Sequence, residues 1–94
     1  MNEIETLFRD ATQLFRVTRA ELCGPSQRRE VAEARHALAW ALRQRSLTLA
    51  QIGRLLGNRS YTTILNSCTR AEALARHDRS YALKLARLAA PHHR

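Results

Sequence analysis

The sequence predicts an all-α, compact multi-helix domain that contains a helix-turn-helix. Apolar residues recur at spacings of three and four through most of the chain, which is the period of an amphipathic helix. Only three glycines and two prolines occur among the 94 residues, too few for an all-β fold rich in turns. The length and the 45% apolar content fit one globular domain over residues 1–94.

The first expected helix covers residues 3–16, and a short second helix follows it. The apolar stripe of the first helix comprises Ile4, Leu7, Phe8, Ala11 and Phe15. Thr18 and Glu21 have the spacing of a capping box, in which each side chain satisfies a free amide at the start of a helix. Gly24 and Pro25 end the short helix, and the glycine suits a left-handed exit.

The third expected helix begins with Ser26 as its N-cap and runs to about Arg45. Its core stripe comprises Val31, Ala34, Leu38, Ala41 and Leu42. Trp40 lies off this stripe, so we expect it to pack against the first helix or the last one.

Residues 48–76 form the expected helix-turn-helix. Thr48 and Gln51 repeat the capping-box spacing and open a helix of about two turns. Its apolar side chains are Leu49, Ile52, Leu55 and Leu56. Gly53 inside this helix costs about 1 kcal/mol relative to alanine. A residue without a side chain offsets that cost if it lets the second helix approach closely. Residues 57–59 then make a tight turn.

The second helix of the motif starts after Ser60 as N-cap. Its expected inward side chains are Ile64, Leu65, Cys68 and Ala71. The first turn, residues 60–63, is polar with one aromatic ring, and recognition helices present such residues to base edges in the major groove. A last helix, about 80–90, carries Tyr81, Leu85 and Leu88, and we expect residues 91–94 to fray.

The charge indicates an anionic partner. The net charge is +8, and residues 25–94 carry thirteen basic against four acidic side chains. All basic residues except Lys84 are arginines, whose planar fork of donors fits phosphate and guanine edges. Double-stranded DNA is therefore the first expected partner. Genomic base bias is the alternative explanation of the arginine content.

Other classes of function find little support. No apolar run approaches the roughly 20 residues that span a bilayer, and the acidic N-terminus is not a signal peptide. Cys23 and Cys68 lack metal or redox spacing, and the histidines are scattered. No paired carboxylates or Ser/His/Asp set is present. We therefore expect no enzyme, cofactor, metal, nucleotide or membrane partner, and a cytoplasmic, nucleoid-associated location.

Two segments carry a resemblance to a known family. Residues 31–42 read VAEARHALAWAL, and residues 49–65 read LAQIGRLLGNRSYTTIL. They are similar to the motifs Val-x-x-x-Arg-x-x-Ala-Met-x-Leu and Leu-x-x-Ile-Gly-x-x-Phe-Gly-Gly-Arg-Asp-His-Thr-Thr-Val. Over about residues 4–76 the chain thus resembles the C-terminal DNA-binding domain (domain IV) of the bacterial replication initiator DnaA, with its TrpR-like fold.

The resemblance implies sequence-specific binding of double-stranded DNA at DnaA-box-like sites, in replication initiation or its regulation. It assigns Arg35 to an A·T-rich minor groove, and Arg28 and Arg29 to backbone phosphates. The resemblance also implies that the start of the first helix of the motif, at Thr48, Leu49 and Gln51, contacts a DNA phosphate. The implied contacts around the second helix are Arg59 with phosphate or a groove edge, Thr62 with a base, and Thr63 with a backbone oxygen or a methyl group.

Three positions depart from the family pattern. Ser60 and Tyr61 replace its Asp-His pair, and Asn66 replaces a histidine further along the same face. Serine is less selective than a carboxylate, which accepts from cytosine, whereas asparagine reads adenine through two hydrogen bonds. Because of these three residues, we expect the chain to bind a variant of the DNA box or to bind with relaxed sequence specificity.

The initiator's ATPase has no counterpart here, since no Gly-x-x-x-x-Gly-Lys-Ser/Thr phosphate loop occurs in the 94 residues. The chain reads as either an excised domain or a stand-alone relative. Two alternatives stay open, a transcriptional regulator and a protein-interaction module. The second would dock a homo-oligomer partner or an initiator protein through Phe8 and Phe15, residues that core packing also explains.

Overall fold

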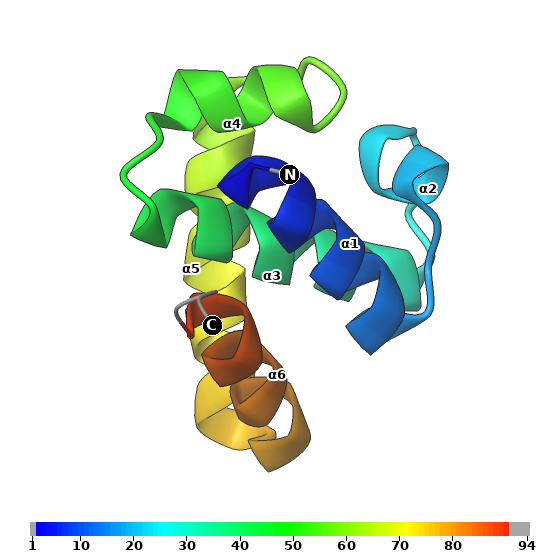
Figure 1. The fold of residues 1–94 in the computed structure, drawn as a ribbon, viewed down its shortest axis with the longest axis vertical. Helices are drawn as coiled ribbons and strands as arrows, with labels where there is room; N and C mark the ends of the chain where they lie inside the picture. The colour runs from blue at the N-terminus through cyan, green and yellow to red at the C-terminus, as the bar shows by residue number, and fades with distance from the viewer. Residues whose placement is uncertain (1, 91–94) are drawn as a thin grey trace.

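The computed structural model describes residues 2–90, and within them the fold is all-α, as predicted (Figure 1). The tail at 91–94, expected to fray, lies outside the described residues. The helices are α1 (Glu3–Phe15), α2 (Arg19–Cys23), α3 (Arg29–Gln44), α4 (Leu49–Leu55), α5 (Tyr61–His77) and α6 (Arg79–Ala89). No helix among these residues is long and apolar enough to cross a membrane.

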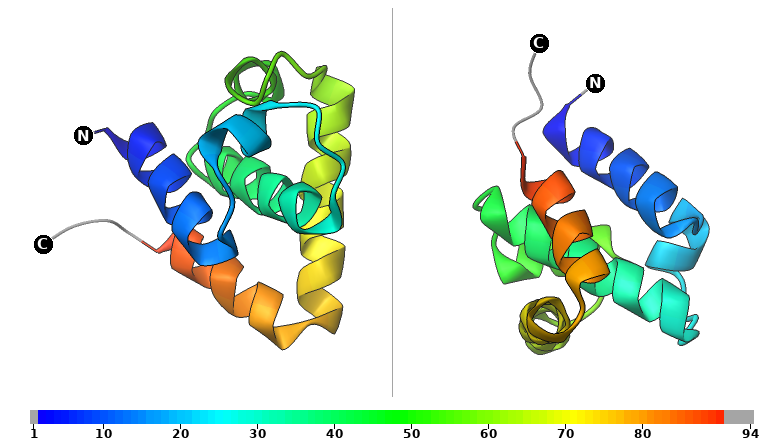
Figure 2. Two further views of the ribbon diagram at one scale, coloured as in Figure 1. Left: turned by 90° about the vertical axis from the view of Figure 1, so that its right-hand side faces the viewer. Right: turned by 90° about the horizontal axis from the view of Figure 1, so that it is seen from below.

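The central helix is α3, which separates two layers. Helix α1 lies on one side of it and α5 on the other, and α6 runs from the end of α5 and packs against α1, α3 and α5 (Figure 2). Alanines at four core positions let the neighbouring helices approach α3 closely. The fully buried side chains of α3 are Val31, Ala34, Ala37, Leu38, Ala39, Ala41 and Leu42.

The predicted caps at three helix starts are confirmed. Both capping boxes form: the hydroxyl of Thr18 accepts from the Glu21 amide at 3.0 Å, and that of Thr48 from the Gln51 amide at 3.1 Å. The hydroxyl of Ser60 accepts from the Thr63 amide at 3.2 Å. These caps fix where α2, α4 and α5 begin.

Two details around the α2–α3 loop differ from expectation. The N-cap of α3 is Arg28, and the Ser26 hydroxyl accepts from the Arg28 amide at 3.3 Å instead of capping the helix. Gly24 ends α2 with φ −97°, an extended conformation and not a left-handed one. The following Pro25 explains this, because the residue before a proline is restricted to extended conformations.

The aromatic residues mostly pack as the sequence predicts. Phe8 is buried, and Phe15 lies edge-on to Tyr81 with ring centroids 5.8 Å apart. The Tyr81 hydroxyl donates to the Glu33 carbonyl at 2.7 Å and so ties α6 to α3. Trp40 packs half-buried against the core. Core packing therefore accounts for Phe8 and Phe15, the residues of the protein-interaction alternative.

The prediction that Leu65 faces inward on α5 is wrong. Half of its surface is exposed, whereas Ile64, Cys68 and Ala71 are buried as expected. Ser67 occupies the remaining buried position on this helix. The stripe of α5 that faces α3 is narrow, so one of the two adjacent apolar residues is left on its edge.

Candidate nucleic-acid interface

The turn between α4 and α5 is held by backbone packing against Gly53. The amide of Arg59 donates to the Gly53 carbonyl at 2.9 Å, which brings the turn across α4. A Cβ atom on Gly53 would collide with the carbonyl oxygen of Arg59 and lie 3.7 Å from Ile64 Cγ1. The prediction that a residue without a side chain permits a close approach here is confirmed, and the partner is the turn itself.

This packing leaves the start of α5 open to solvent. Ser60, Tyr61, Thr62, Thr63 and Asn66 are all exposed, and Tyr61 retains 64% of its surface. The hydroxyl groups of Ser60 and Thr63 lie 3.1 Å apart at the helix tip. The sequence-predicted tip of the recognition helix therefore presents hydroxyl, amide and ring groups outward, in a convex shape that can enter a groove.

Beside the tip runs a groove between α5 and the loop that joins α2 to α3. The loop lies along the N-terminal half of α5 (Figure 2). The groove has a volume of about 520 Å³. Its lining residues are Pro25, Ser26, Gln27, Ala32, Arg35, His36, Arg59, Thr63 and Ser67. No carboxylate is among them, so the charge that faces the groove is positive.

Arg35 holds the wall of this groove from behind. Only 6% of its surface is exposed. Its Nε donates to the Leu22 carbonyl at 2.8 Å, and its Nη2 lies within 2.9–3.3 Å of three further carbonyl oxygens, those of Glu21, Gly24 and Ser26. These carbonyls lie at the C-terminus of α2 and in the loop after it, and that of Glu21 also accepts from the Gly24 amide.

This placement gives Arg35 contacts other than the minor groove that the family resemblance implies. A side chain so buried reaches a groove edge only by leaving the carbonyls it satisfies. Burial first, and then the nearby charge of Arg59, lower the pKa of Arg35 from its ordinary value. The geometry gives Arg35 a structural task, which is to fasten α2 and its loop to α3.

Arg59 is half-buried and joins α4 to α2. Its Nη2 donates to the Gly24 carbonyl at 2.6 Å, and its Nη1 donates to the Leu56 carbonyl. The guanidinium has five donors, and it lines the groove next to Thr63. Arg59 therefore keeps donors for a phosphate oxygen while its position is fixed by the fold.

Arg28 and Arg29 lie exposed where α3 begins, next to the groove loop. Arg28 pairs with Glu21 at 3.5 Å and Glu30 at 3.9 Å. Arg29 pairs with Glu33 at 3.3 Å. Exposed pairs of this kind contribute only about 0–1 kcal/mol, so exchanging a carboxylate for a DNA phosphate costs little.

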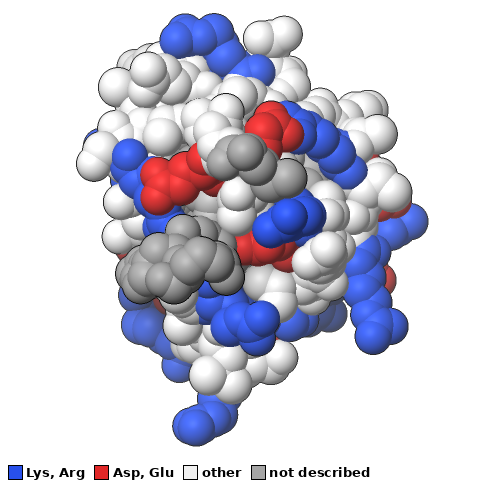
Figure 3. Space-filling model, in the orientation of Figure 1, with Lys and Arg blue, Asp and Glu red and all other residues white. Residues whose placement is uncertain are grey.

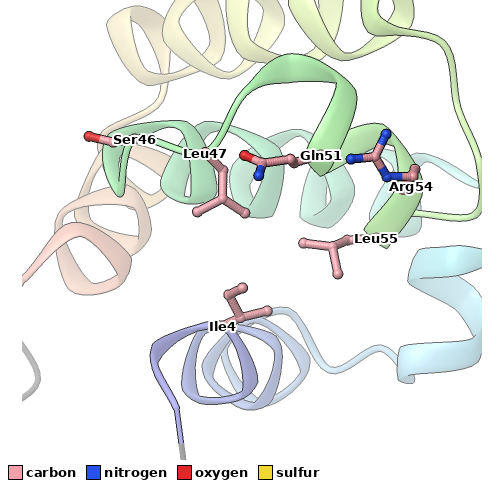
Figure 4. Close-up of a pocket in the computed structure, with 6 residues that line it drawn as sticks. All are labelled: Ile4, Ser46, Leu47, Gln51, Arg54 and Leu55. Carbon is pink, nitrogen blue, oxygen red and sulfur yellow. The ribbon is translucent and has the colours of Figure 1, made fainter.

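The structure does not bring every predicted residue into this groove. Thr48 and Gln51 cap α4 through their side chains, and Leu49 packs half-buried against the core. Gln51 lines another depression, between α1 and α4, into which the side chains of Ile4, Leu47 and Leu55 point (Figure 4). Any phosphate contact at the start of α4 is thus separate from the groove beside α5.

Sequence reasoning missed three residues of this surface. His36 and Ser67 line the groove from α3 and α5, and Leu65 lies exposed beside Asn66. Leu65 follows Tyr61 by four residues, a spacing that places two side chains on one helix face and that signals a shared surface. Nothing in the local sequence marks His36 or Ser67, because the contact between α3 and α5 creates their position.

The opposite face of the molecule has a different character. The view toward α1 and α6 shows acidic side chains interspersed with basic ones (Figure 3). Glu5 pairs with Arg19 at 2.6 Å and Glu3 with Arg45 at 2.9 Å. The groove beside α5, which is lined by Arg35 and Arg59 and by no carboxylate, is therefore a better binding surface for a polyanion.

We predict that the protein loses stability when the solution is acidified from about pH 7.5 to 5.5. Burial first, and then the charges of Arg70 and Arg35, lower the pKa of His36. Its Nδ1 is buried and has no hydrogen-bond partner among the described residues. The unfolded chain, with a histidine pKa near 6.5, takes up the proton first. The free energy of unfolding should then fall by at most about 1.4 kcal/mol per pH unit below that value.

Urea denaturation at several pH values measures this effect. His36→Gln, which cannot be protonated, should flatten the profile between pH 7 and 5.5. Identical profiles for the wild type and this variant would contradict the prediction.

Comparison with known proteins agrees with this geometry. The family described as "Bacterial dnaA protein helix-turn-helix" matches residues 4–71. The chain belongs to this family. It is 39% identical over 75 residues to the chromosomal replication initiator protein DnaA of Thermomicrobium roseum, covering 79% of this chain and 16% of that protein. It is 34% identical over 85 residues to the DnaA of Nostoc punctiforme, covering 89% of this chain and 18% of that protein.

The match to the DnaA family includes the loop before α3, all of α4 and the part of α5 up to residue 71. The chain spans less than a fifth of the length of these DnaA relatives. The matched region contains the three departures at Ser60, Tyr61 and Asn66, all exposed on α5. The family therefore accounts for the fold, while the three departures lie on the exposed N-terminal part of α5.

Proposed function

We propose that this chain is a DNA-binding module that recognises DnaA-box-like sites in double-stranded DNA and acts in replication initiation or its regulation. The observation that carries the proposal is the exposed, uncharged first turn of α5 beside a groove whose charged lining residues are both arginines. Membership of the DnaA helix-turn-helix family supports it.

In this proposal, the N-terminal half of α5 lies along the major groove. Tyr61, Thr62 and Asn66 face the base edges, and Ser60 and Thr63 lie near the sugar-phosphate backbone. One backbone strand follows the groove between α5 and the α2–α3 loop, where Arg59 and the first residues of α3 approach its phosphates. Thr48, Leu49 and Gln51 stay a predicted second phosphate contact, at the start of α4.

A titration of the purified protein against two duplexes tests this proposal. One duplex carries a DnaA box, and the other carries the same bases in scrambled order. We expect tighter binding of the first duplex, and we expect the ratio of the two affinities to persist at two salt concentrations. Equal affinities, or no binding to either duplex at low salt, would contradict the proposal.

We predict that Arg28→Ala weakens binding to specific and scrambled duplexes by similar factors. Arg28 has no base-reading role in the proposed arrangement, so its loss removes one phosphate contact from every complex. The slope of log affinity against log salt should become less steep by about 0.9. Fluorescence anisotropy between 50 and 250 mM salt measures both quantities.

Arg9→Ala provides the matched control. Arg9 is exposed on α1, which lies across α3 from α5 (Figure 2). Its removal changes the net charge equally, so it should leave the slope almost unaltered. If both variants alter the slope equally, only overall charge matters and the assigned phosphate contact is wrong.

A further inference from the structure

An apolar pair stands on the exposed face of the recognition helix. Within residues 2–90 the exposed large hydrophobic side chains are Tyr61, Leu65 and Leu83, with 64%, 50% and 57% of their surface open. Two of these three lie on α5, four residues apart, so they project from the same face about 6 Å apart along the helix axis. An exposed apolar pair at the tip of a helix that carries hydroxyl and amide groups can contact an apolar group of a partner.

The charged side chains that read a G·C pair most specifically are missing from the same turns. Arginine or lysine reads guanine, and aspartate or glutamate accepts from cytosine. From Tyr61 to Thr69 the helix contains no charged residue, and its first one is Arg70. The groups that remain are hydroxyls, the amide of Asn66, and the apolar pair.

These remaining groups fit A·T pairs. Adenine presents an acceptor and a donor side by side, which an asparagine amide satisfies with two hydrogen bonds. Thymine presents its C5-methyl group to the same groove, where an apolar side chain meets it. Asn66 adjoins Leu65 and lies four residues after Thr62, so the polar and apolar readers form neighbouring rows on one surface.

We propose that the first two turns of α5 recognise consecutive A·T base pairs, with Tyr61 and Leu65 contacting thymine C5-methyl groups and Asn66 contacting an adenine. This inference rests on the proposed function, and it names the base pairs that α5 contacts. Along the helix axis the two apolar side chains are separated by about 6 Å, close to the 6.8 Å that two base-pair steps span at about 3.4 Å each. The two methyl groups therefore belong to base pairs about two steps apart.

The first step of the test finds a site without presupposing one. Duplexes with a randomised central segment are bound to the wild-type protein, recovered and sequenced over several rounds. We expect the enriched duplexes to share a run of A·T pairs. Enrichment of G·C pairs throughout the shared site would overturn the inference, and enrichment of no sequence would instead refute the proposed function.

The second step removes single methyl groups from the enriched duplex. Each thymine is replaced in turn by deoxyuridine, which keeps the base pair and lacks only the C5-methyl group. We expect a roughly fourfold loss of affinity at two positions, the size of one buried methyl group. The loss at one position should vanish in Leu65→Ala and the loss at the other in Tyr61→Ala.

Leu83→Ala on α6 is the matched control, because it removes an exposed leucine that is not on the first two turns of α5 and should leave every affinity unchanged. Circular dichroism confirms that the variants fold, as expected for exposed positions. If deoxyuridine has no effect anywhere, or has the same effect in every variant, the inference fails although specific binding stands. It also fails if light scattering shows a DNA-independent dimer that Leu65→Ala abolishes.

Discussion

Arg35→Ala should lower the free energy of unfolding by about 3 kcal/mol, a large share of the stability of a domain this small. The guanidinium donates to four carbonyl oxygens at 2.8–3.3 Å. Its removal takes this donor from the carbonyls of Leu22 and Ser26, whereas those of Glu21 and Gly24 keep the Gly24 amide and the Arg59 guanidinium as donors. The positive charge also interacts favourably with the C-terminus of α2. Equilibrium denaturation in urea measures the loss.

Two further variants distinguish the loss of these hydrogen bonds from the loss of the positive charge of Arg35. Arg35→Lys keeps the charge but has no planar fork to span the carbonyls, so it should recover only part of the stability. Arg29→Ala removes an exposed arginine from the same helix and should change the free energy of unfolding by no more than about 0.5 kcal/mol.

The Arg35→Ala variant also shows whether Arg35 has a structural role or reads bases. If Arg35 fastens the loop, affinity for specific and scrambled duplexes should fall together, because the groove beside α5 loses its wall. A stable Arg35→Ala protein that loses only its preference for a specific duplex would restore the minor-groove role that the family resemblance implies.

The sequence was informative where the cause of a structure is local. The capping pairs Thr18–Glu21 and Thr48–Gln51 lie three residues apart, so the spacing alone predicts two helix starts. The exposed tip at Ser60 follows from the same reasoning. The candidate site could be outlined because it lies on one such helix.

The sequence was least informative where the cause is tertiary. Arg35 lies on α3, and its partners lie 9–14 residues earlier in the chain, so no local pattern distinguishes it from an exposed arginine. Leu65 has the spacing of a core residue, and only the narrow contact between α5 and α3 leaves it half exposed. The placement of both residues depends on how a helix is turned toward its neighbours, which is set by packing and not by periodicity.

Gly53→Ala should lower the free energy of unfolding by about 3 kcal/mol, against the direction that helix propensity predicts. Helix propensity alone would raise the free energy of unfolding of Gly53→Ala by about 1 kcal/mol, because alanine is the better helix former inside α4. The added Cβ, however, would overlap the carbonyl oxygen of Arg59, a backbone atom that cannot rotate away. The turn would have to separate from α4 and would lose the hydrogen bond of 2.9 Å from the Arg59 amide to the Gly53 carbonyl.

Ala50→Gly supplies the opposite comparison, since Ala50 is exposed on the same helix and its replacement should cost the ordinary amount of about 1 kcal/mol. Glycine would then be unfavourable at 50 and required at 53, three residues away. Because Arg59 directly precedes the tip of α5, Gly53→Ala should also weaken binding of a specific duplex more than Ala50→Gly does at temperatures where both are folded. A Gly53→Ala protein more stable than the wild type would show that the turn moves freely, and that its contact with α4 does not set the position of the recognition helix.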